Sequence, residues 1–103
     1  MSVLVEFAMF PVDKGDSVSN YVVEIIKNID EMGISYQLTA MGTIFETQTM
    51  AEALDVIKKS YECLESSSDR VYSTVKFDIQ KNRYNRIETK IESIENKVGK
   101  VHK

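Results

Sequence analysis

Two kinds of hydrophobic repeat follow each other along this chain, and their order is the feature that most constrains its fold. Residues 2–11, 34–40, 43–48 and 70–80 are rich in β-branched and aromatic side chains, and the second and fourth segments alternate apolar with polar residues. Such alternation is typical of strands with two distinct faces. We therefore predict four strands, the first of which ends at Pro11 because proline has no N–H group for a sheet.

The segments between and after these strands repeat their apolar side chains every three or four residues, which predicts three helices. The predicted stripes are Val18, Val22, Ile25, Ile26, Ile29 and Met32 in the first helix; Met50, Ala53, Leu54, Ile57, Tyr61 and Leu64 in the second; and Ile87, Ile91, Ile94 and Val98 in the third.

Several residues mark the ends of these helices. Asp16 or Ser17 can cap the first helix, and Gly33 is placed to end it in a left-handed conformation. Thr49 followed by Glu52 is a capping-box pattern for the second helix. We expect the third helix to begin after Asn85 and the residues from 99 onward to fray.

The resulting order is strand, helix, strand, strand, helix, strand and a C-terminal helix. A βαββαβ order is typical of the ferredoxin-like fold, and right-handed crossovers leave few other arrangements. We therefore predict the α+β class, with an antiparallel sheet in the order 4-1-3-2 and the two main helices on one face. The chain of 103 residues is expected to form a single domain, 1–103.

The hairpin between the second and third strands has a specific predicted register. We expect Ala40 to pair with Thr43, which places Leu38 opposite Phe45. A type I turn with a bulge suits this connection, and it would hold Gly42 in the left-handed region.

This topology brings four segments to one end of the sheet, namely residues 10–15, 17–20, 39–43 and 68–70. Loops at one end of a rigid scaffold are where binding groups usually collect. The segments carry hydroxyl groups and the free N–H groups of a helix N-terminus. We expect Pro11, Ser19 and the tip from Met41 to Thr43 to surround one hollow. Two other interpretations stay open: Ser17 as a helix cap and Gly42 as a turn residue.

The face of the sheet away from the two main helices mixes apolar and charged side chains, among them Leu4, Glu6, Ile44 and Tyr72. A partly apolar face that nothing covers favours a partner. A second subunit, the C-terminal helix, or solvent alone can meet it. We favour the second subunit, because a chain of this length buries a limited core.

Composition excludes several classes of function. The formal net charge is −3, whereas nucleic-acid-binding proteins usually carry a basic excess. The apolar runs are short and no basic segment precedes the first strand, so we expect no membrane partner and no secretory signal. With one cysteine, Cys63, and one histidine, His102, we expect no disulfide, no metal site, no cofactor and no histidine-based catalysis. The expected setting is the cytoplasm.

An ordered set of segments resembles the small thiamine-binding (YkoF-like) proteins. The set comprises Pro11, residues 17–22 (SVSNYV), 33–38 (GISYQL) and 41–46 (MGTIFE), Arg70 with Val71, residues 76–79 (KFDI), Arg83, and residues 90–95 (KIESIE). The resemblance implies a ferredoxin-like fold, a homotetramer or dimer formed sheet to sheet, and non-enzymatic binding of thiamine or its hydroxymethylpyrimidine moiety. It implies these binding residues: Ser17, Ser19, Tyr36, Thr39, Met41, Gly42, Thr43 and Glu46.

The chemistry of such a ligand suits these residue types. Hydroxyl and N–H groups can meet the ring nitrogens and amino group of an aminopyrimidine, Tyr36 can stack on a ring, and Glu46 can meet the cationic thiazolium. Because a helix N-terminus repels a cation, we expect the pyrimidine to lie nearest Ser17 and Ser19.

Two other functions stay open at this point. The chain could be an oligomeric interaction or regulatory protein without a small-molecule ligand. It could also be an enzyme that uses Glu46 or Glu6 as a base, because these carboxylates fall on strands predicted to be neighbours.

Overall fold

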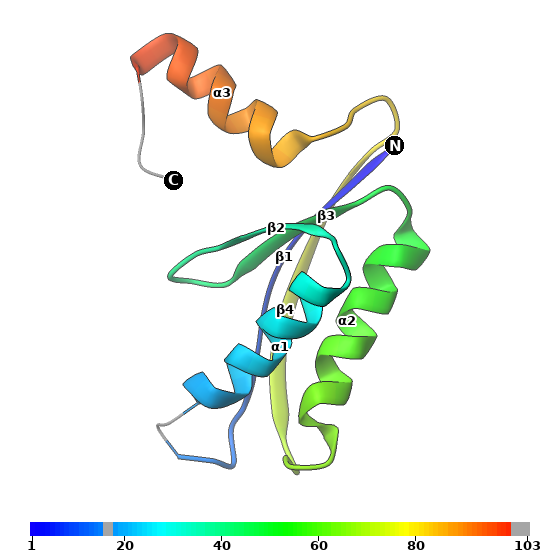
Figure 1. Ribbon diagram of the computed structural model, residues 1–103, viewed down its shortest axis with the longest axis vertical. Helices are drawn as coiled ribbons and strands as arrows, with labels where there is room; N and C mark the ends of the chain where they lie inside the picture. Colours follow the sequence, from blue (N-terminus) through cyan, green and yellow to red (C-terminus); the bar gives the residue numbers. More distant parts are fainter. Residues whose placement is uncertain (16–17, 100–103) are drawn as a thin grey trace.

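The elements follow the predicted order in a computed structural model that describes residues 1–15 and 18–99 (Figure 1). They are β1 (Ser2–Pro11), α1 (Ser19–Glu31), β2 (Ser35–Leu38), β3 (Thr43–Thr47), α2 (Met50–Glu65), β4 (Val71–Gln80) and α3 (Arg86–Val98).

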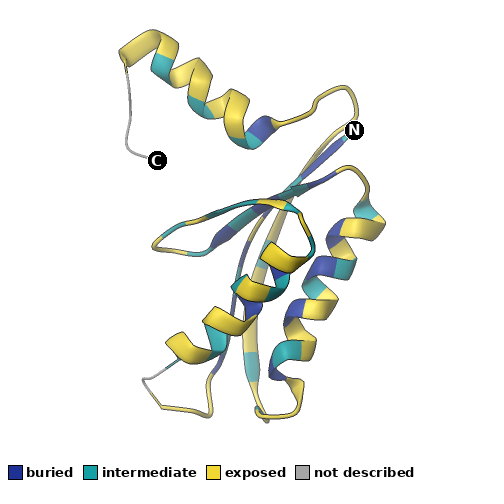
Figure 2. Ribbon diagram, viewed as in Figure 1, coloured by how far each residue is buried: buried dark blue, intermediate teal, exposed yellow. Residues whose placement is uncertain are grey.

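The strands form one antiparallel sheet in the order β2-β3-β1-β4, which confirms the ferredoxin-like α+β prediction. Both α1 and α2 pack on one face of it (Figure 1). The odd-numbered residues of β1 point toward these helices and are buried. Figure 2 shows buried segments along the sheet and on α2. Among them, Phe7 meets Phe45 of β3 edge to face, with ring centroids 5.6 Å apart. The helices complete this core with Ile25, Ile29, Ala53, Val56 and Leu64.

The second helix begins as the capping pattern predicts. The Thr49 hydroxyl accepts a hydrogen bond from the backbone N–H of Glu52 at 3.1 Å and donates one to the Glu52 carboxylate at 2.9 Å. Gly33, after α1, has a φ of 69°, which confirms its left-handed conformation. The cap position of α1 is Val18, whose side chain makes no capping bond, while Asp16 and Ser17 lie outside the described residues.

The buried face of α2 differs from the predicted stripe. Val56 and Ser60 are buried, whereas Leu54 and Tyr61 are exposed. The hydroxyl of Ser60 donates to the carbonyl oxygen of Val56 at 2.7 Å, so its polar group is satisfied within the helix. A serine that bonds to the preceding turn can therefore sit in a core that an apolar pattern alone does not assign to it.

The central strand β1 has two unequal neighbours. It pairs with β4 over its whole length, from Ser2 opposite Gln80 to Pro11 opposite Val71. With β3 it pairs only as far as Phe7 opposite Thr43. Residues 8–11 of β1 therefore have no strand beside them on the β3 side among the residues that the structure describes.

The predicted hairpin register is wrong by two residues. Leu38, and not Ala40, pairs with Thr43, so that Tyr36 faces Phe45 and residues 39–42 form the loop. The Thr39 side chain closes this loop. Its hydroxyl donates to the Gly42 carbonyl at 2.8 Å and accepts from the N–H groups of Met41 and Gly42 at 3.2 and 3.1 Å. A shift of two keeps every side chain on its predicted face, because the repeat of a strand is also two.

Gly42 is required for a reason other than the predicted left-handed turn, since its φ is not positive. A Cβ atom at this position would lie 2.8 Å from the carbonyl oxygen of Phe7. The absence of a side chain thus lets the loop lie against the backbone of β1.

We predict that Gly42→Ala lowers the free energy of unfolding by about 1 to 3 kcal/mol, because the added methyl group pushes the loop away from β1. Urea denaturation measures this change. Ala40→Ser, at an exposed position of the same loop, is the matched control and should stay within about 0.5 kcal/mol of the wild type. Equal stability of the two variants would contradict a tight loop contact.

Candidate functional site

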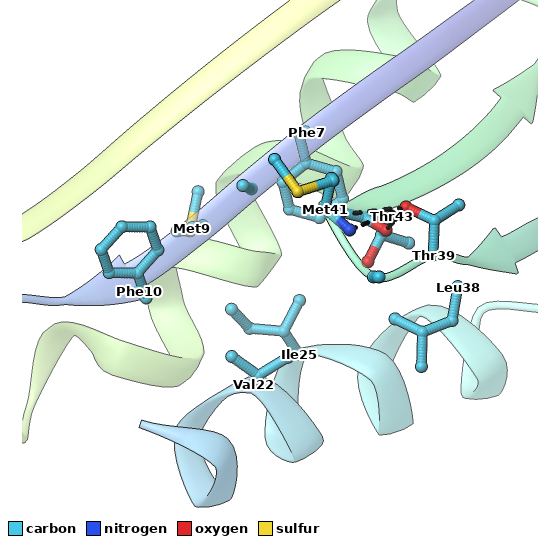
Figure 3. Close-up of a pocket in the computed structure, with 12 residues that line it drawn as sticks. Phe7, Met9, Phe10, Val22, Ile25, Leu38, Thr39, Met41 and Thr43 are labelled. Carbon is cyan, nitrogen blue, oxygen red and sulfur yellow. Dashed lines mark hydrogen bonds between the residues drawn. The ribbon is translucent and has the colours of Figure 1, made fainter. Parts of the chain in front are cut away.

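A hollow of about 290 Å³ opens where β1 extends beyond the β2–β3 hairpin, on the side of the sheet that faces α1 (Figure 3). Its volume lies near the lower end of the range for small-molecule sites, about 300 to 1,000 Å³. The residues that line it are Phe7, Ala8, Met9, Phe10, Val22, Ile25, Leu38, Thr39, Ala40, Met41, Gly42 and Thr43.

The free edge of β1 gives this hollow backbone hydrogen-bonding groups. Val12 donates its N–H to the carbonyl of Arg70 at 3.0 Å, which continues the register of β1 with β4 and shows that even-numbered residues direct their backbone groups toward β4. Alternate residues of a strand direct theirs to the other side. Met9 therefore directs its N–H and C=O groups toward the hollow, beyond the last residue of β1 that β3 pairs with.

Most of the wall is apolar. Val22 and Ile25 contribute from α1, and Leu38 contributes from the end of β2, as their positions in Figure 3 show. Met41 is 86% exposed at the loop tip, so its flexible side chain stands at the rim of the hollow.

Two threonines contribute hydroxyl groups to the lining, and these hydroxyl groups differ in their hydrogen bonding. The Thr39 hydroxyl is engaged within the loop, as donor to Gly42 and acceptor from Met41 and Gly42. Thr43 is only 5% exposed, and its hydroxyl makes no hydrogen bond to any other residue that the structure describes. Thr43 is therefore the side chain in the lining that keeps a polar group available for a ligand.

The structure brings together half of the residues expected to bind a ligand. Thr39, Met41, Gly42 and Thr43 line the hollow, whereas Ser19, Tyr36 and Glu46 do not, and Ser17 lies outside the described residues. From α1, Val22 and Ile25 line the hollow together with the hairpin tip, and Ser19 at the start of the helix does not. The expected grouping of Pro11 and Ser19 with the tip is therefore wrong, because the hairpin ends level with Phe7 and is too short to reach Pro11.

Glu46 lies away from the hollow, and its carboxylate contacts the start of α3. Its carboxylate accepts hydrogen bonds from the Ser2 hydroxyl and from the backbone N–H groups of Arg86 and Ile87, the latter two at 3.0 and 3.4 Å. It thereby satisfies the free N–H groups at the start of α3. Partial burial opposes ionisation, but these hydrogen bonds outweigh it and hold the pKa of Glu46 below its ordinary value.

Arg86 completes the attachment of α3 and is itself buried. Its guanidinium donates to the Ser2 hydroxyl at 2.9 Å and to the Ser2 carbonyl at 3.1 Å, and it forms an ion pair with Asp78 at 3.0 Å. Beyond this first turn, α3 runs past β2 and leaves Ile94 and Val98 exposed. The C-terminal helix thus meets the open face of the sheet only near its own beginning.

Tyr36 lies outside the hollow because its hydroxyl is directed toward α1. It donates to the Asp30 carboxylate at 3.2 Å, and this bond to an acidic partner raises the pKa of Tyr36. Glu6, the other candidate base, forms an ion pair with Lys76 at 3.6 Å. The two candidate carboxylates are thus held by different partners. Within residues 1–15 and 18–99, no three His, Cys, Asp or Glu side chains gather in a way that could hold a metal ion.

Sequence reasoning missed the part of the lining that comes from β1 and the middle of α1, namely Phe7, Met9, Val22 and Ile25. Their apolar character assigned them to the core, and most of their surface is indeed buried. The available signal was the unequal length of the predicted strands, since a short hairpin cannot cover a long first strand.

Known proteins resemble this chain over most of its length. A family model described as thiamine-binding protein matches residues 5–95. A UPF0045 protein from Methanothermobacter thermautotrophicus is 30% identical over 83 residues, which cover 80% of this chain and 84% of the relative. Another, from Methanocaldococcus jannaschii, is 34% identical over 89% of this chain and 91% of its own. None of these names specifies an enzymatic activity.

Solved structures share the fold. A crystal structure of a hypothetical protein from Methanocaldococcus jannaschii has a TM-score of 0.80 and 33% identity, and covers 90% of this chain and 95% of that one. A Thermotoga maritima protein, assigned provisionally to thiamine biosynthesis or salvage, has a TM-score of 0.78 at 20% identity over 91% of this chain and 99% of that one. In the part of the chain described, no helix has the length and apolar character needed to cross a membrane.

We predict that Glu46→Gln destabilises the attachment of α3 by about 1.5 to 3 kcal/mol, because it removes a charged acceptor of hydrogen bonds. Circular dichroism and hydrogen exchange of the α3 amides measure the loss. Since the folded pKa lies below the ordinary value of 4.5, the stabilisation is present at neutral pH and is lost as the pH falls below 4.5. The difference between wild type and variant should therefore shrink on acidification.

Glu6→Gln is the matched control, because Glu6 lies on the same face and forms an exposed ion pair, worth about 0 to 1 kcal/mol. Unchanged exchange of the α3 amides in Glu46→Gln would show that the carboxylate does not hold the helix.

Proposed function

Since this chain belongs to the thiamine-binding protein family, we propose that it binds thiamine, or the hydroxymethylpyrimidine part of it, in the hollow between β1, α1 and the β2–β3 loop. The protein acts as a binder or carrier and does not transform the ligand.

The free edge of β1 is the observation that supports a pyrimidine most directly. An aminopyrimidine presents an amino donor beside a ring-nitrogen acceptor, which is the pair of groups that a neighbouring strand would present. The N–H and C=O of Met9 complement this pair, so the heterocycle takes the place that β3 leaves empty. The Thr43 hydroxyl then meets a further polar atom, and Val22 and Ile25 pack on the ring.

The orientation of thiamine follows from charge. No acidic side chain among residues 1–15 and 18–99 lines the hollow, and Glu46, the carboxylate first considered for the thiazolium, is engaged at the start of α3. A cation is costly to bury without a partner. The pyrimidine therefore enters along β1, and the thiazolium stays near the exposed rim beside Met41.

The composition of the lining supports a binding function over catalysis. It contains apolar residues, one glycine and two threonines, and none of these side chains titrates near neutral pH. General acid–base chemistry requires such a group within reach of the ligand.

We further propose that the protein is a cytoplasmic homo-oligomer, a tetramer in its full form, that associates through the open face of the sheet. The exposed Tyr72 and the half-buried Leu4 and Ile44 support this assembly, because α3 leaves that face largely uncovered.

Isothermal titration with thiamine, hydroxymethylpyrimidine and the isolated thiazole alcohol tests the binding function. We expect saturable binding of the first two and none of the third. No binding of thiamine or of the pyrimidine would refute the proposed function, whereas binding of the thiazole half alone would refute the orientation.

Thr43→Val should weaken pyrimidine binding about fivefold to tenfold, because it removes one hydrogen bond and keeps the shape of the side chain. Ser19→Ala, at an exposed position outside the lining, is the control and should leave the affinity unchanged. Equal effects of both substitutions would mean that the ligand does not lie beside Thr43.

A further inference from the structure

A groove of about 490 Å³ lies between β2, an outer strand of the sheet, and the first two turns of α3. It is separate from the hollow, because no residue lines both. The helix α3 packs against β1 and β3 and stands beside β2 without filling the space next to it.

The β2 side of this groove offers backbone hydrogen-bonding groups. Thr39 donates its N–H to the carbonyl of Gly42 at 2.8 Å, which continues the register of β2 with β3 and shows that odd-numbered residues of β2 direct their backbone groups toward β3. Even-numbered residues direct theirs to the other side. Tyr36 therefore presents its N–H and C=O at a free edge, with which no strand among the described residues pairs. Such an edge is a template for another extended chain.

The side chains of β2 leave this edge accessible. The Tyr36 side chain is directed away from the groove, because its hydroxyl bonds to Asp30 of α1. Ser35 and Gln37 line the groove on either side of Tyr36, and neither side chain makes a hydrogen bond to another residue that the structure describes. Their polar groups are therefore available to a partner.

The α3 side of the groove combines apolar and acidic side chains. Ile87 and Ile91, one helical turn apart, are half-buried. Glu88 and Glu92, also one turn apart, are exposed, and neither forms an ion pair with any residue that the structure describes. Like charges at this spacing destabilise a helix. A cationic group on an apolar stem would relieve this repulsion.

We propose that this groove binds an extended segment of a partner protein, which pairs with β2 as an added strand and carries Lys or Arg at alternate positions. Alternate residues of a strand lie about 6.6 Å apart on one face, and side chains one turn apart on a helix lie about 5 to 6 Å apart. Two basic side chains of the segment thus match the spacing of Glu88 and Glu92. Long basic side chains bury their methylene stems on apolar surface, which Ile87 and Ile91 supply.

The charge of the groove selects among extended segments. An acidic segment would be repelled by Glu88 and Glu92, and a purely apolar segment would leave both carboxylates without a partner. A small amine without a peptide backbone would meet the carboxylates but leave the N–H and C=O of Tyr36 unused. A basic segment in the extended conformation satisfies both sides of the groove.

Titration with a synthetic peptide tests the proposal. The probe is the capped, fluorescently labelled heptapeptide Thr-Lys-Val-Lys-Val-Lys-Thr, whose lysines share one face of a strand. We expect saturable binding by fluorescence anisotropy at low ionic strength. The matched control, Thr-Lys-Lys-Lys-Val-Val-Thr, has the same composition and charge. It should bind about fivefold more weakly, because adjacent side chains of a strand point to opposite faces.

Paired substitutions test the carboxylates. Glu88→Gln combined with Glu92→Gln should weaken binding of the probe about fivefold, because two exposed ion pairs are lost. Glu62→Gln combined with Glu65→Gln is the control, since it removes the same charge from exposed positions of α2 outside the groove. The control should leave the affinity unchanged.

Hydrogen exchange tests the pairing with β2 on the unmodified chain. The probe should slow exchange of the Tyr36 amide, whereas the amide of Gln37, which bonds to β3, should be protected with or without it. This readout separates strand pairing from attraction by charge alone.

Preference for the alternating peptide, together with slower exchange at Tyr36, would support the proposal. Equal binding of the two peptides, equal effects of the two paired substitutions, or an unchanged Tyr36 amide would overturn it. Protection of Tyr36 that rises with protein concentration while the probe fails to bind would also overturn it, because a second copy would then occupy the groove. Titration with thiamine is independent of these outcomes, since the hollow and the groove share no residue.

Discussion

The unequal pairing of β1 is the constraint on which the rest of the structure depends. This strand is paired along its full length by β4 but only as far as Phe7 by β3. Because the hairpin is short, the far half of β1 keeps a free edge, and the apolar side chains of α1 close a hollow over it. The same sheet ends at β4, whose own edge has no neighbour among the described strands. The open edge of β1 thus suits a small planar ligand.

A second constraint holds the C-terminal helix. Ser2, Glu46 and Arg86 come from β1, β3 and α3, and their hydrogen bonds join the start of α3 to the sheet. A buried arginine is stable there because carbonyl and carboxylate oxygens satisfy its guanidinium. Glu46 therefore contributes to architecture, and the described residues that line the hollow proposed for the ligand include no charged side chain.

Much of the fold follows from local patterns that can be recognised in the sequence. The alternation in β4, the stripe of α1, the cap at Thr49 and the glycine at position 33 all act between residues close in sequence. The hairpin register did not follow, because the Thr39 hydroxyl closes a longer loop than the expected turn. The buried Ser60 likewise depends on a hydroxyl that bonds within its own helix, which an apolar pattern does not register.

By itself, the sequence determined the order of the elements, their faces, and the likeness to a thiamine-binding family, since all of these depend on periodicity and on short segments of residues. Only the tertiary structure decided which residues surround the hollow and which partner Glu46 meets. The lining of the hollow depends on how far β1 extends beyond β3, and the partner of Glu46 depends on atoms brought together from distant segments of the chain. Both Thr43 and Glu46 were candidate ligand contacts from the sequence. The structure places Thr43 in the lining of the hollow and Glu46 at the start of α3, where its carboxylate accepts hydrogen bonds from backbone N–H groups.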